Sequence, residues 1–368
     1  MPQNVTIRIS PTEAANEKLL KQRLASAVKT KPENINAYQI IRRSLHARSR
    51  NIIAQLQVNV FINEEFSDDF EFHPNLQNVE NKHEVYIAGA GPAGLFAALE
   101  LIEQGLKPII IERGKNVRDR RRDLAAMNKE GKVNPESNYC YGEGGAGTYS
   151  DGKLYTRSTK RGNILKSLQW FVHFGATERI LQEAHPHIGT NKLPGIIANM
   201  REAIIECGGE VWFDTKLTDI IIENNQIKGI EINHDKKIKT SSLILATGHS
   251  ARDIFRMLDD KNVLIEAKPF ALGVRVEHHQ SLIDSSQYHC PIGSERNEFL
   301  PPASYSLVSQ EAGRGVFSFC MCPGGIIAPA STDEGELVVN GWSPSKRDGF
   351  FANSGMVVTV DENDFAKY

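Results

Sequence analysis

The sequence predicts a mixed α/β fold in which a small α+β module precedes a strand–helix–strand domain and a β-rich region follows it. Three observations support this fold class. Residues 84–104 read as a buried strand, a glycine-rich turn and an apolar helix. Residues 4–62 begin and end in segments that alternate polar and apolar side chains. Residues 265–345 are rich in short strand patterns, Gly and Pro. At about 150 residues per domain, a chain of this length holds two or three domains.

The composition is that of an ordinary globular protein. Hydrophobic residues make up 40% and charged residues 24% of the 368 residues, enough for a sizeable core without metal or disulfide staples. A formal charge of −2 gives no electrostatic reason to expect nucleic acid or anionic lipid as a partner. No apolar run approaches the ~20 residues that span a bilayer. The start, MPQNVTIRIS, lacks signal-peptide features, and five scattered cysteines suit reduced thiols, so we expect a cytoplasmic protein.

The first unit covers residues 1–75 and reads as an α+β module. Its predicted elements are strands at 4–10 and 52–62 and helices at 13–28 and 33–50. Polar and acidic residues at 64–81 predict a linker. The arginines of this module are Arg42, Arg43, Arg48 and Arg50. They allow contact with RNA or a phosphate, but nearby acids balance the charge, so a solvated helix face is the favoured interpretation.

Residues 84–114 carry the strongest local signal. Val85, Ile87 and Ala88 predict a buried strand, and Gly89-Ala90-Gly91-Pro92-Ala93-Gly94 follows it as a G-x-G-x-x-G turn. The first glycine allows a tight turn, the second lets backbone approach a pyrophosphate, and the third lets the helix pack on the strand. Pro92 suits the first turn of that helix, whose free N–H groups then face the phosphates.

A second apolar strand follows and ends at an acidic residue. Gly105 ends the helix, and Pro108 begins the strand that runs to Glu112, 18 residues past Gly94. At this distance a carboxylate can accept both hydroxyls of an adenosine ribose. Strand, glycines, helix, strand and acid in this order predict a dinucleotide site, although they do not distinguish FAD from NAD.

Two further features favour FAD. Ala246-Thr247-Gly248 ends an apolar strand that begins at Leu243, and a glycine-rich loop, GEGGAGTYSDGK, occupies 142–153. Four glycines within six residues let backbone press against an extended cofactor, and the Ser-Asp-Gly-Lys turn offers it a hydroxyl, a carboxylate and an ammonium group. The alternative is an ordinary flexible connection, which would have little use for so many glycines.

These motifs resemble those of a known family. The strand–helix–strand unit, Glu112-Arg113, a three-strand meander within 210–248 and the Ala-Thr-Gly strand are similar to the glutathione-reductase-type FAD domain. GEGGAGTYSDGKLYTR, ATGHSARD, KPFALGVRVEH and FSFCMCPGG resemble a bacterial family of FAD-dependent dehydrogenases of unassigned substrate. The resemblance covers essentially the whole chain. The FAD contacts that it implies are Gly89, Gly91, Pro92, Ala93, Gly94, Glu112, Arg113, Gly144, Gly145, Ala146, Gly147, Leu217, Ala246, Thr247 and Gly248.

The resemblance implies a Rossmann-type FAD-binding domain made of residues 82–165 and 195–260. Residues 166–194 and 261–368 are then an inserted, β-rich substrate or cap region. A C-terminal strand, glycine-rich turn and helix usually close on the flavin in this fold, and we find no such pattern downstream of 248. We therefore expect a chain that lacks its closing segment and holds the flavin half of FAD loosely.

The candidate chemistry is that of the flavin itself, because the sequence shows no catalytic triad. Cys320-Met321-Cys322 places two thiols on one face of a strand. No C-x-x-C follows the glycine turn, so reduced structural thiols are favoured over a redox pair. His249 follows the Ala-Thr-Gly strand and is weighed as a loop residue rather than a catalytic one. The histidines at 185, 187, 278 and 279 lack the further ligands of a metal site. The mixed charges of 118–123 predict a solvated helix face at a helix start.

The sequence leads to one main functional hypothesis and two alternatives. The main hypothesis is an FAD-dependent oxidoreductase that transfers a hydride between a small unidentified substrate and flavin. No second glycine turn is predicted between a strand and a helix, since GEGGAG at 142–147 lies in a loop, so NAD(P)H would bind only transiently as a donor. The alternatives are an RNA-directed flavoprotein guided by the first module, and a flavin-binding module without turnover. The near-neutral charge argues against the RNA alternative.

Overall fold

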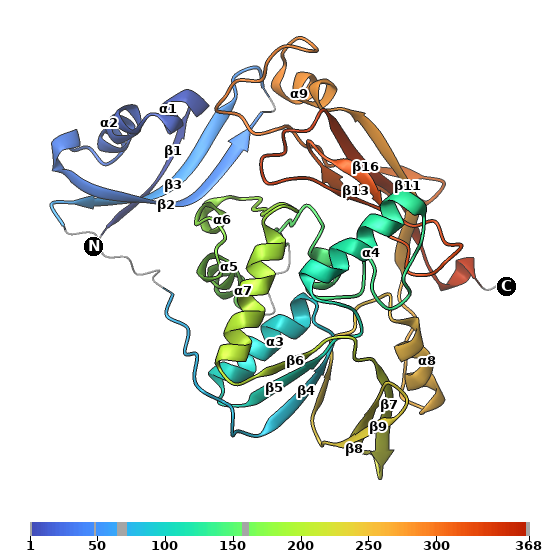
Figure 1. Cartoon of the computed structure of the whole chain (residues 1–368). Coiled ribbons are helices and arrows are strands. Elements are labelled where there is room, and N and C mark those ends of the chain that lie inside the picture. Colours follow the sequence, from blue (N-terminus) through green and yellow to red (C-terminus); the bar gives the residue numbers. More distant parts are fainter. Residues whose placement is uncertain (1, 48, 65–71, 157–161, 366–368) are drawn as a thin grey trace.

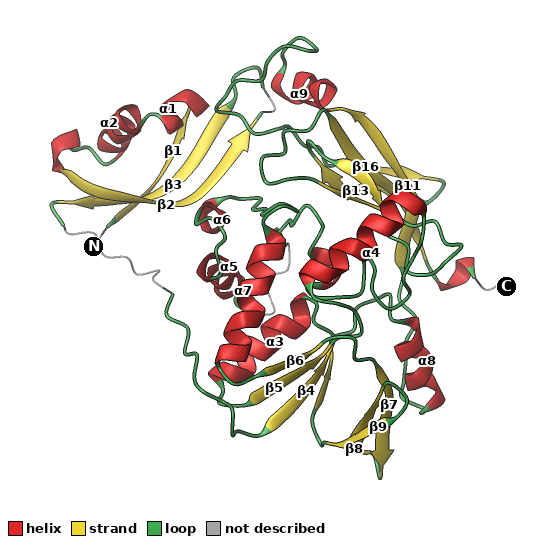
Figure 2. Ribbon diagram, in the orientation of Figure 1, coloured by secondary structure: helices red, strands yellow, loops and turns green. Residues whose placement is uncertain are grey.

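The computed structural model describes residues 2–47, 49–64, 72–156 and 162–365. Three parts are visible in Figure 1: the N-terminal module, a parallel sheet flanked by helices, and a C-terminal β-rich region. Figure 2 shows that helices concentrate around the parallel sheet, while the C-terminal region is mainly strand.

The N-terminal module is an antiparallel sheet with helices on one side. Its elements are β1 (Gln3–Ile9), α1 (Pro11–Ala15), α2 (Glu17–Ala27), a 3₁₀ turn (Pro32–Asn34), β2 (Ile35–His46) and β3 (Ile53–Ile62). The strands lie in the order β1-β3-β2. Leu20 and Leu24 of α2 pack on Leu56 and Val58 of β3 to form the core. The predicted strands at 4–10 and 52–62 are confirmed, and the predicted helix at 13–28 is interrupted at Asn16, whose side chain caps α2.

The predicted helix at 33–50 is wrong, because this segment forms β2. A register shift between Ile40 and Arg42 marks a bulge in the pairing of β2 with β3. The bulge breaks the strand's alternation of side chains, which is the pattern that identifies a strand in sequence. Arg42 and Arg43 therefore lie on a strand rather than on a helix face. Arg48, and residues 65–71 of the expected linker, lie outside the described residues.

The central sheet is parallel throughout. Its strands are β4 (Glu84–Ala88), β5 (Lys107–Ile111), β6 (Glu210–Trp212) and β10 (Leu243–Leu245), in the order β10-β4-β5-β6. The helices α3 (Pro92–Glu103) and α7 (Leu193–Glu206) share one hydrophobic core with β4 and β5. The chain crosses from β4 to β5 on one side and reaches β10 on the other. The carboxyl end of β4 is therefore a switch point, the place where such sheets bind ligands.

Residues 164–206 pack beside this core. α5 (Ile164–His173) and α6 (Arg179–Gln182) contribute Trp170 and Ile180 to the same cluster as Leu95 of α3. We expected residues 166–194 to belong with the cap, but the structure packs much of this segment against the nucleotide-binding core. Gly189 and His187 do contact Ser345 of the β-rich region, so the segment touches both parts.

The predicted meander within 210–248 is present. The chain leaves the parallel sheet after β6, forms β7 (Leu217–Glu223), β8 (Gln226–Ile232) and β9 (Lys236–Lys239), and returns as β10. β7, β8 and β9 form their own antiparallel sheet. α8 (Arg252–Asp260) follows, and its Ile254 packs against Leu217 of β7 and Tyr141.

The C-terminal region is β-rich, as the sequence predicts. Its elements are β11 (Phe270–His279), α9 (Gln280–Tyr288), β12 (Val308–Glu311), β13 (Arg314–Cys322), β14 (Ile326–Pro329), β15 (Val339–Trp342), β16 (Phe351–Val360) and a 3₁₀ turn (Glu362–Asp364). The main sheet has the order β11-β16-β13-β12, and β14 and β15 form a hairpin.

Within the described ranges, no helix has the length and apolar character needed to cross a membrane.

The N-terminal module is tied to the rest of the chain through β2. The backbone N–H of Ala184, next to α6, donates to the carbonyl oxygen of Arg43 at 2.9 Å. A ring nitrogen of His289, after α9, lies 3.2 Å from the carbonyl oxygen of Ala47. β2 therefore contacts segments that lie far from it in sequence.

Candidate functional site

The carboxyl edge of the parallel sheet opens onto a cavity of about 510 Å³, within the range of small-molecule sites. β4 runs into the glycine turn, β5 into Glu112-Arg113 and β10 into Ala246-Thr247-Gly248. The expected cofactor contacts line this cavity, with the exception of Gly94 and Gly144. Residues far apart in sequence are thus brought together at one edge, as the motif order predicts.

The glycines of the turn 89–94 have different surroundings. Gly89 has φ +108°, and a Cβ there would lie 2.4 Å from the carbonyl oxygen of Ala246. A Cβ at Gly94 would lie 1.9 Å from the carbonyl oxygen of Gly89. A Cβ at Gly91 would meet only the Cα of Gly145, at 4.0 Å. Gly89 and Gly94 are therefore needed for packing, whereas Gly91 leaves room that opens on the cavity.

The N-terminus of α3 reaches the same space. Gly91 is the N-cap residue and Pro92 the first helical residue, and within the described residues no side chain caps this end. The first N–H groups of a helix have no partner within the helix and, with the helix dipole, favour an anion. A pyrophosphate placed at Gly91 would meet these groups, so this part of the cavity fits a dinucleotide.

The glycine-rich loop 142–153 lies across the turn. Gly145 to Gly147 form a 3₁₀ turn that lines the cavity, and a Cβ at Gly145 or Gly147 would lie 3.6 Å from the ring of Pro92. Gly144 donates its N–H to the carbonyl oxygen of Ala90 at 2.8 Å, so it supports the loop from behind rather than lining the cavity. The loop is ordered by these backbone contacts and is no simple flexible connection.

Glu112 holds backbone together at the centre of the site. Its carboxylate accepts hydrogen bonds from the N–H groups of Ala90, Gly114 and Gly142, at 2.8, 2.9 and 2.9 Å. Only 5% of the residue is exposed. We expected this carboxylate to bind ribose hydroxyls, and the structure adds a second role, since Glu112 also joins the glycine turn to the loop at 142.

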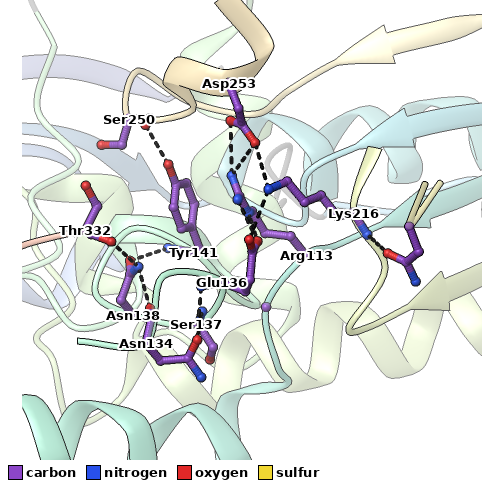
Figure 3. A network of polar contacts seen from close by, with 12 residues as sticks. Arg113, Asn134, Glu136, Ser137, Asn138, Tyr141, Lys216, Ser250, Asp253 and Thr332 are labelled. Atoms are coloured by element: carbon purple, nitrogen blue, oxygen red, sulfur yellow. Dashed lines mark hydrogen bonds and ion pairs between the residues drawn. The ribbon is translucent and has the colours of Figure 1, made fainter. Parts of the chain in front are cut away.

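A network of charges borders the cavity beside Tyr141 (Figure 3). Arg113 donates to Glu136 at 2.6 Å and pairs with Asp253 at 3.1 Å, and Lys216 pairs with the same two acids at 3.0 and 3.2 Å. The Arg113 guanidinium lies over the Tyr141 ring, 4.2 Å from its centre.

The charges of this network decide its ionisation. Burial alone would raise the pKa of Asp253, but Arg113 and Lys216 outweigh it and the pKa lies below its usual range. Burial raises the pKa of Tyr141 to about 12, so its hydroxyl stays protonated and donates to the carbonyl oxygen of Ser250. Arg113 was predicted as a site residue, whereas Glu136, Tyr141 and Lys216 were not.

The third side of the cavity follows β10. A Cβ at Gly248 would meet nothing within 4 Å, but the φ of +73° lies in the left-handed region that favours glycine. Leu217 lines the cavity from β7, and His249 lines it directly after Gly248. The sequence brought His249 into consideration but gave it no role. Asp253 is the last residue of the ATGHSARD motif quoted above, and that motif could have indicated that Asp253 lines this side of the cavity.

Arg120 departs most from what the sequence predicts. We expected the charges of 118–123 to form a solvated face of a helix, and α4 (Val117–Glu130) does begin here. Arg120 is fully buried, however, with 0% exposure. Its guanidinium donates to the carbonyl oxygens of Asn138, Tyr139, Glu143 and Gly145 and to the hydroxyl of Thr148, at 2.6–3.3 Å. A side chain at Gly142 would clash with it at 2.5 Å, which explains that glycine.

The Ser-Asp-Gly-Lys turn does not line this cavity. Asp151 is 1% exposed and pairs with Lys153 of the same turn. It also pairs with Arg347 and Ser343, which link the turn to the β-rich region. The expectation that this turn offers a hydroxyl, a carboxylate and an ammonium group to the cofactor is therefore not met at this cavity. Among the described residues, no group of three or more His, Cys, Asp or Glu side chains is placed to hold a metal ion.

Comparison with known proteins assigns the class. Residues 82–125 match the family described as FAD binding domain, and residues 269–368 match the family described as FAD-dependent protein, C-terminal domain-like. Residues 1–61 match a domain of unknown function. The matched glycine turn is the one that borders the cavity. The chain is a flavoprotein with FAD as its cofactor.

A longer relative defines the family. An uncharacterized protein of Clostridium beijerinckii is 40% identical over 366 aligned residues, which cover 94% of this chain and 67% of the relative. The chain belongs to the same family, a family of FAD-dependent proteins without an assigned substrate. A thiamine thiazole synthase of Aeropyrum pernix is 28% identical over 152 residues, 41% of this chain and 44% of that protein.

Solved structures show more distant likeness. The match to the flavin-dependent brominase Bmp2 covers 77% of this chain and 57% of the brominase chain, at 15% identity and a TM-score of 0.37. The match to the glycine oxidase of Bacillus cereus covers 78% of this chain and 76% of the oxidase chain, at 15% identity and a TM-score of 0.30. A TM-score this low carries no information about activity.

Proposed function

We propose that the protein is an FAD-dependent oxidoreductase that transfers a hydride between a small substrate and flavin, with NAD(P)H as a transient donor. The observation that carries this proposal is the cavity at the switch point of the sheet, where Gly91, the N-terminus of α3 and the turn Gly145–Gly147 converge. Bound flavin supplies the two-electron chemistry, so the chain's task is to bind and orient.

The proposed orientation follows the charges of the cavity. The pyrophosphate lies at Gly91 and the N-terminus of α3, where N–H groups and the helix dipole favour an anion. The adenosine half lies toward Glu112, Arg113 and Leu217. The remaining half extends past Gly145–Gly147. Residues 246–248 line the other side, where Gly248 leaves space for the cofactor.

We also infer a glutathione-reductase-type arrangement with domain bounds near 82–165 and 195–260. The antiparallel sheet β7-β8-β9 between β6 and β10 supports this subtype. The β-rich region from 261 is then the substrate side. All five cysteines are free thiols, which supports a reducing, cytoplasmic compartment.

The proposal is tested in two steps on the 368-residue chain. FAD is titrated into the purified protein and binding is followed by flavin fluorescence, and the complex is then mixed anaerobically with NADH or NADPH. Loss of flavin absorbance on mixing is expected. Tight FAD binding without reduction by either donor would instead favour a flavin-binding module without turnover.

Replacing Glu112 with glutamine should weaken FAD binding less than replacing it with alanine. Alanine leaves the buried N–H groups of Ala90, Gly114 and Gly142 without a partner, which costs about 1–3 kcal/mol for an unsatisfied group. Glutamine keeps one acceptor oxygen of the same shape. The dissociation constants for FAD and the melting temperatures of both variants are the measurements. Equal FAD affinity of the wild type and Glu112→Ala would show that the carboxylate does not contribute to FAD binding.

The double variant Cys320→Ser/Cys322→Ser should still accept electrons at flavin. Neither thiol lines the cavity, and the turn after the glycine motif holds no cysteine pair of the disulfide-reductase kind. We expect the rate of flavin reduction by the nicotinamide donor to stay within about tenfold of wild type. A loss of several orders of magnitude with FAD still bound would place the thiols on the electron path.

A further inference from the structure

Cys320 stands in an unusual backbone conformation at the end of β13. Its φ is +47°, in the left-handed region that residues other than glycine seldom adopt. The pairing of β13 with β16 shifts register between Phe319 and Cys322, so the two cysteines lie on a β-bulge. Bulges and such backbone conformations cost free energy and cluster at functional sites, where they aim side chains.

One ammonium group contacts both thiols. The Nζ of Lys153 lies 3.7 Å from the sulfur of Cys320 and 3.6 Å from that of Cys322. Lys153 is itself held by Asp151 at 3.2 Å, and Arg347 and Ser343 hold Asp151 from the other side. The ammonium is therefore fixed in place before any ligand arrives. This is the arrangement that the Ser-Asp-Gly-Lys turn serves.

The two thiols differ in their surroundings. The guanidinium of Arg275 donates to the carbonyl oxygen of Cys320 at 2.7 Å and lies 4.0 Å from the sulfur of Cys322. The Cys322 thiol donates to the same carbonyl oxygen at 3.3 Å and is fully buried, whereas Cys320 is partly exposed. Cys322 is thus the proton-bearing partner and Cys320 the sulfur that carries negative charge.

The charges that face the pair agree with this division. The neighbouring Cys322 thiol, and then Lys153 and Arg275 against the effect of burial, lower the pKa of Cys320 to about 5. The neighbouring Cys320 and burial raise the pKa of Cys322 well above its usual value. Asp151 opposes the thiolate, and Arg347 and Lys153 offset the charge of Asp151. The thiolate form of Cys320 is lost only as the pH falls through about 5.

We propose that Cys320 and Cys322 form a dithiol site that reduces a small hydroperoxide, with Cys320 as the attacking sulfur and Cys322 as the resolving one. The Cys320 thiolate attacks one peroxide oxygen and the O–O bond breaks. The leaving alkoxide takes a proton from Lys153, and Cys320 becomes a sulfenic acid. The Cys322 thiol then attacks that sulfur, a disulfide forms, and water leaves with the sulfenic oxygen and the thiol proton. This site does not depend on the proposed flavin chemistry.

The geometry admits the second step. Even a regular extended strand separates residues two apart by only about 6.6 Å between Cα atoms, which is within the ~4.4–6.8 Å that a disulfide spans. The bulge at Cys320 departs from that extended geometry. A small ring of this kind is strained, and strained disulfides are the easily reduced ones that catalysis or regulation uses. A soft metal ion is the other ligand that two thiols take, but the ammonium beside both sulfurs opposes a cation.

The test uses hydrogen peroxide and the 368-residue chain loaded with FAD. The protein is exposed to peroxide and digested, and its cysteine-containing peptides are analysed by mass spectrometry. In wild type we expect the peptide with both thiols to lose two hydrogen atoms. In Cys322→Ser we expect a sulfenic acid on Cys320 that dimedone traps. Cys207 is the internal control, because burial raises its pKa and it should react slowly.

Lys153 supplies a second, independent measurement. Lys153→Met should slow oxidation of Cys320 at pH 6 at least about tenfold, whereas Lys153→Arg keeps the positive charge and should restore much of the rate. FAD binding is measured in parallel and shows whether each variant is folded. This measurement is independent of the rate of thiol oxidation. In wild type the oxidation rate should be level above pH 6 and fall below about pH 5. Oxidation of Cys320 no faster than that of Cys207, or a trapped adduct on Cys322, would overturn the proposal.

Discussion

Gly91→Val should produce a folded protein that no longer binds FAD. Gly91 has φ −71° and ψ −178°, an extended conformation that valine adopts without strain. The nearest protein atom to a Cβ at this position is the Cα of Gly145, at 4.0 Å, so the new side chain meets little of the protein. Its methyl groups enter the space where the backbone must approach the pyrophosphate. The affinity for FAD is measured by titration, and the fold by circular dichroism and melting without cofactor.

Two other glycines provide matched controls. Gly195→Val places the same side chain on α7, where a Cβ has nothing within 4 Å, and should leave FAD binding intact. Gly94→Ala adds a single methyl group that lies 1.9 Å from the carbonyl oxygen of Gly89, and it should disrupt the fold itself. Gly91→Val that retains normal FAD affinity would show that the pyrophosphate does not pass this turn.

Arg120→Met should cost about 3–5 kcal/mol of unfolding free energy, the range for breaking a buried charged network. The guanidinium is the common partner of carbonyl groups at 138, 139, 143 and 145, and methionine leaves those groups buried without it. The loop that carries Gly145–Gly147 should lose its shape as well. FAD affinity should therefore fall together with stability, and denaturant unfolding with and without FAD measures both.

Arg122→Met on the same helix is the control, because the Arg122 side chain is 82% exposed. A surface change of this kind should alter unfolding free energy by no more than about 0.5 kcal/mol. Arg120→Lys is a second comparison, since lysine keeps the charge but lacks the planar fork of donors. If Arg120→Met and Arg122→Met are equally stable, Arg120 does not organise the loop.

The parts of the site that the sequence predicts are those that depend on local spacing. The turn at 89–94 and Glu112 follow from the lengths of one strand, one helix and the next strand. Arg120 could not be predicted in this way, because its burial depends on a loop 18–25 residues away that wraps around it. A charged run on a helix is usually solvated, and only the glycine at 142 hints that a side chain passes there.

Two other differences have similar causes. The strand β2 was missed because its bulge hides the alternation on which strand prediction rests. The role of Lys153 was missed because its thiol contacts lie 167 and 169 residues away, in a region that the sequence identifies only as β-rich. The sequence identified both ends of this contact, the turn and the cysteine pair, without indicating that they meet.

The hydrogen bond from Ala184 to the backbone of Arg43 has a consequence for how the molecule melts. A module on a free tether would unfold by itself and give a separate calorimetric transition. Here β2 is joined to the segment next to α6, which belongs to the same core as α3. The slowest amide protons of β2 and β3 should therefore exchange with deuterium only when the parallel sheet also opens. The first 62 residues would then form one cooperative unit with the cofactor domain. The protection of their amide protons against hydrogen exchange should therefore rise with FAD occupancy.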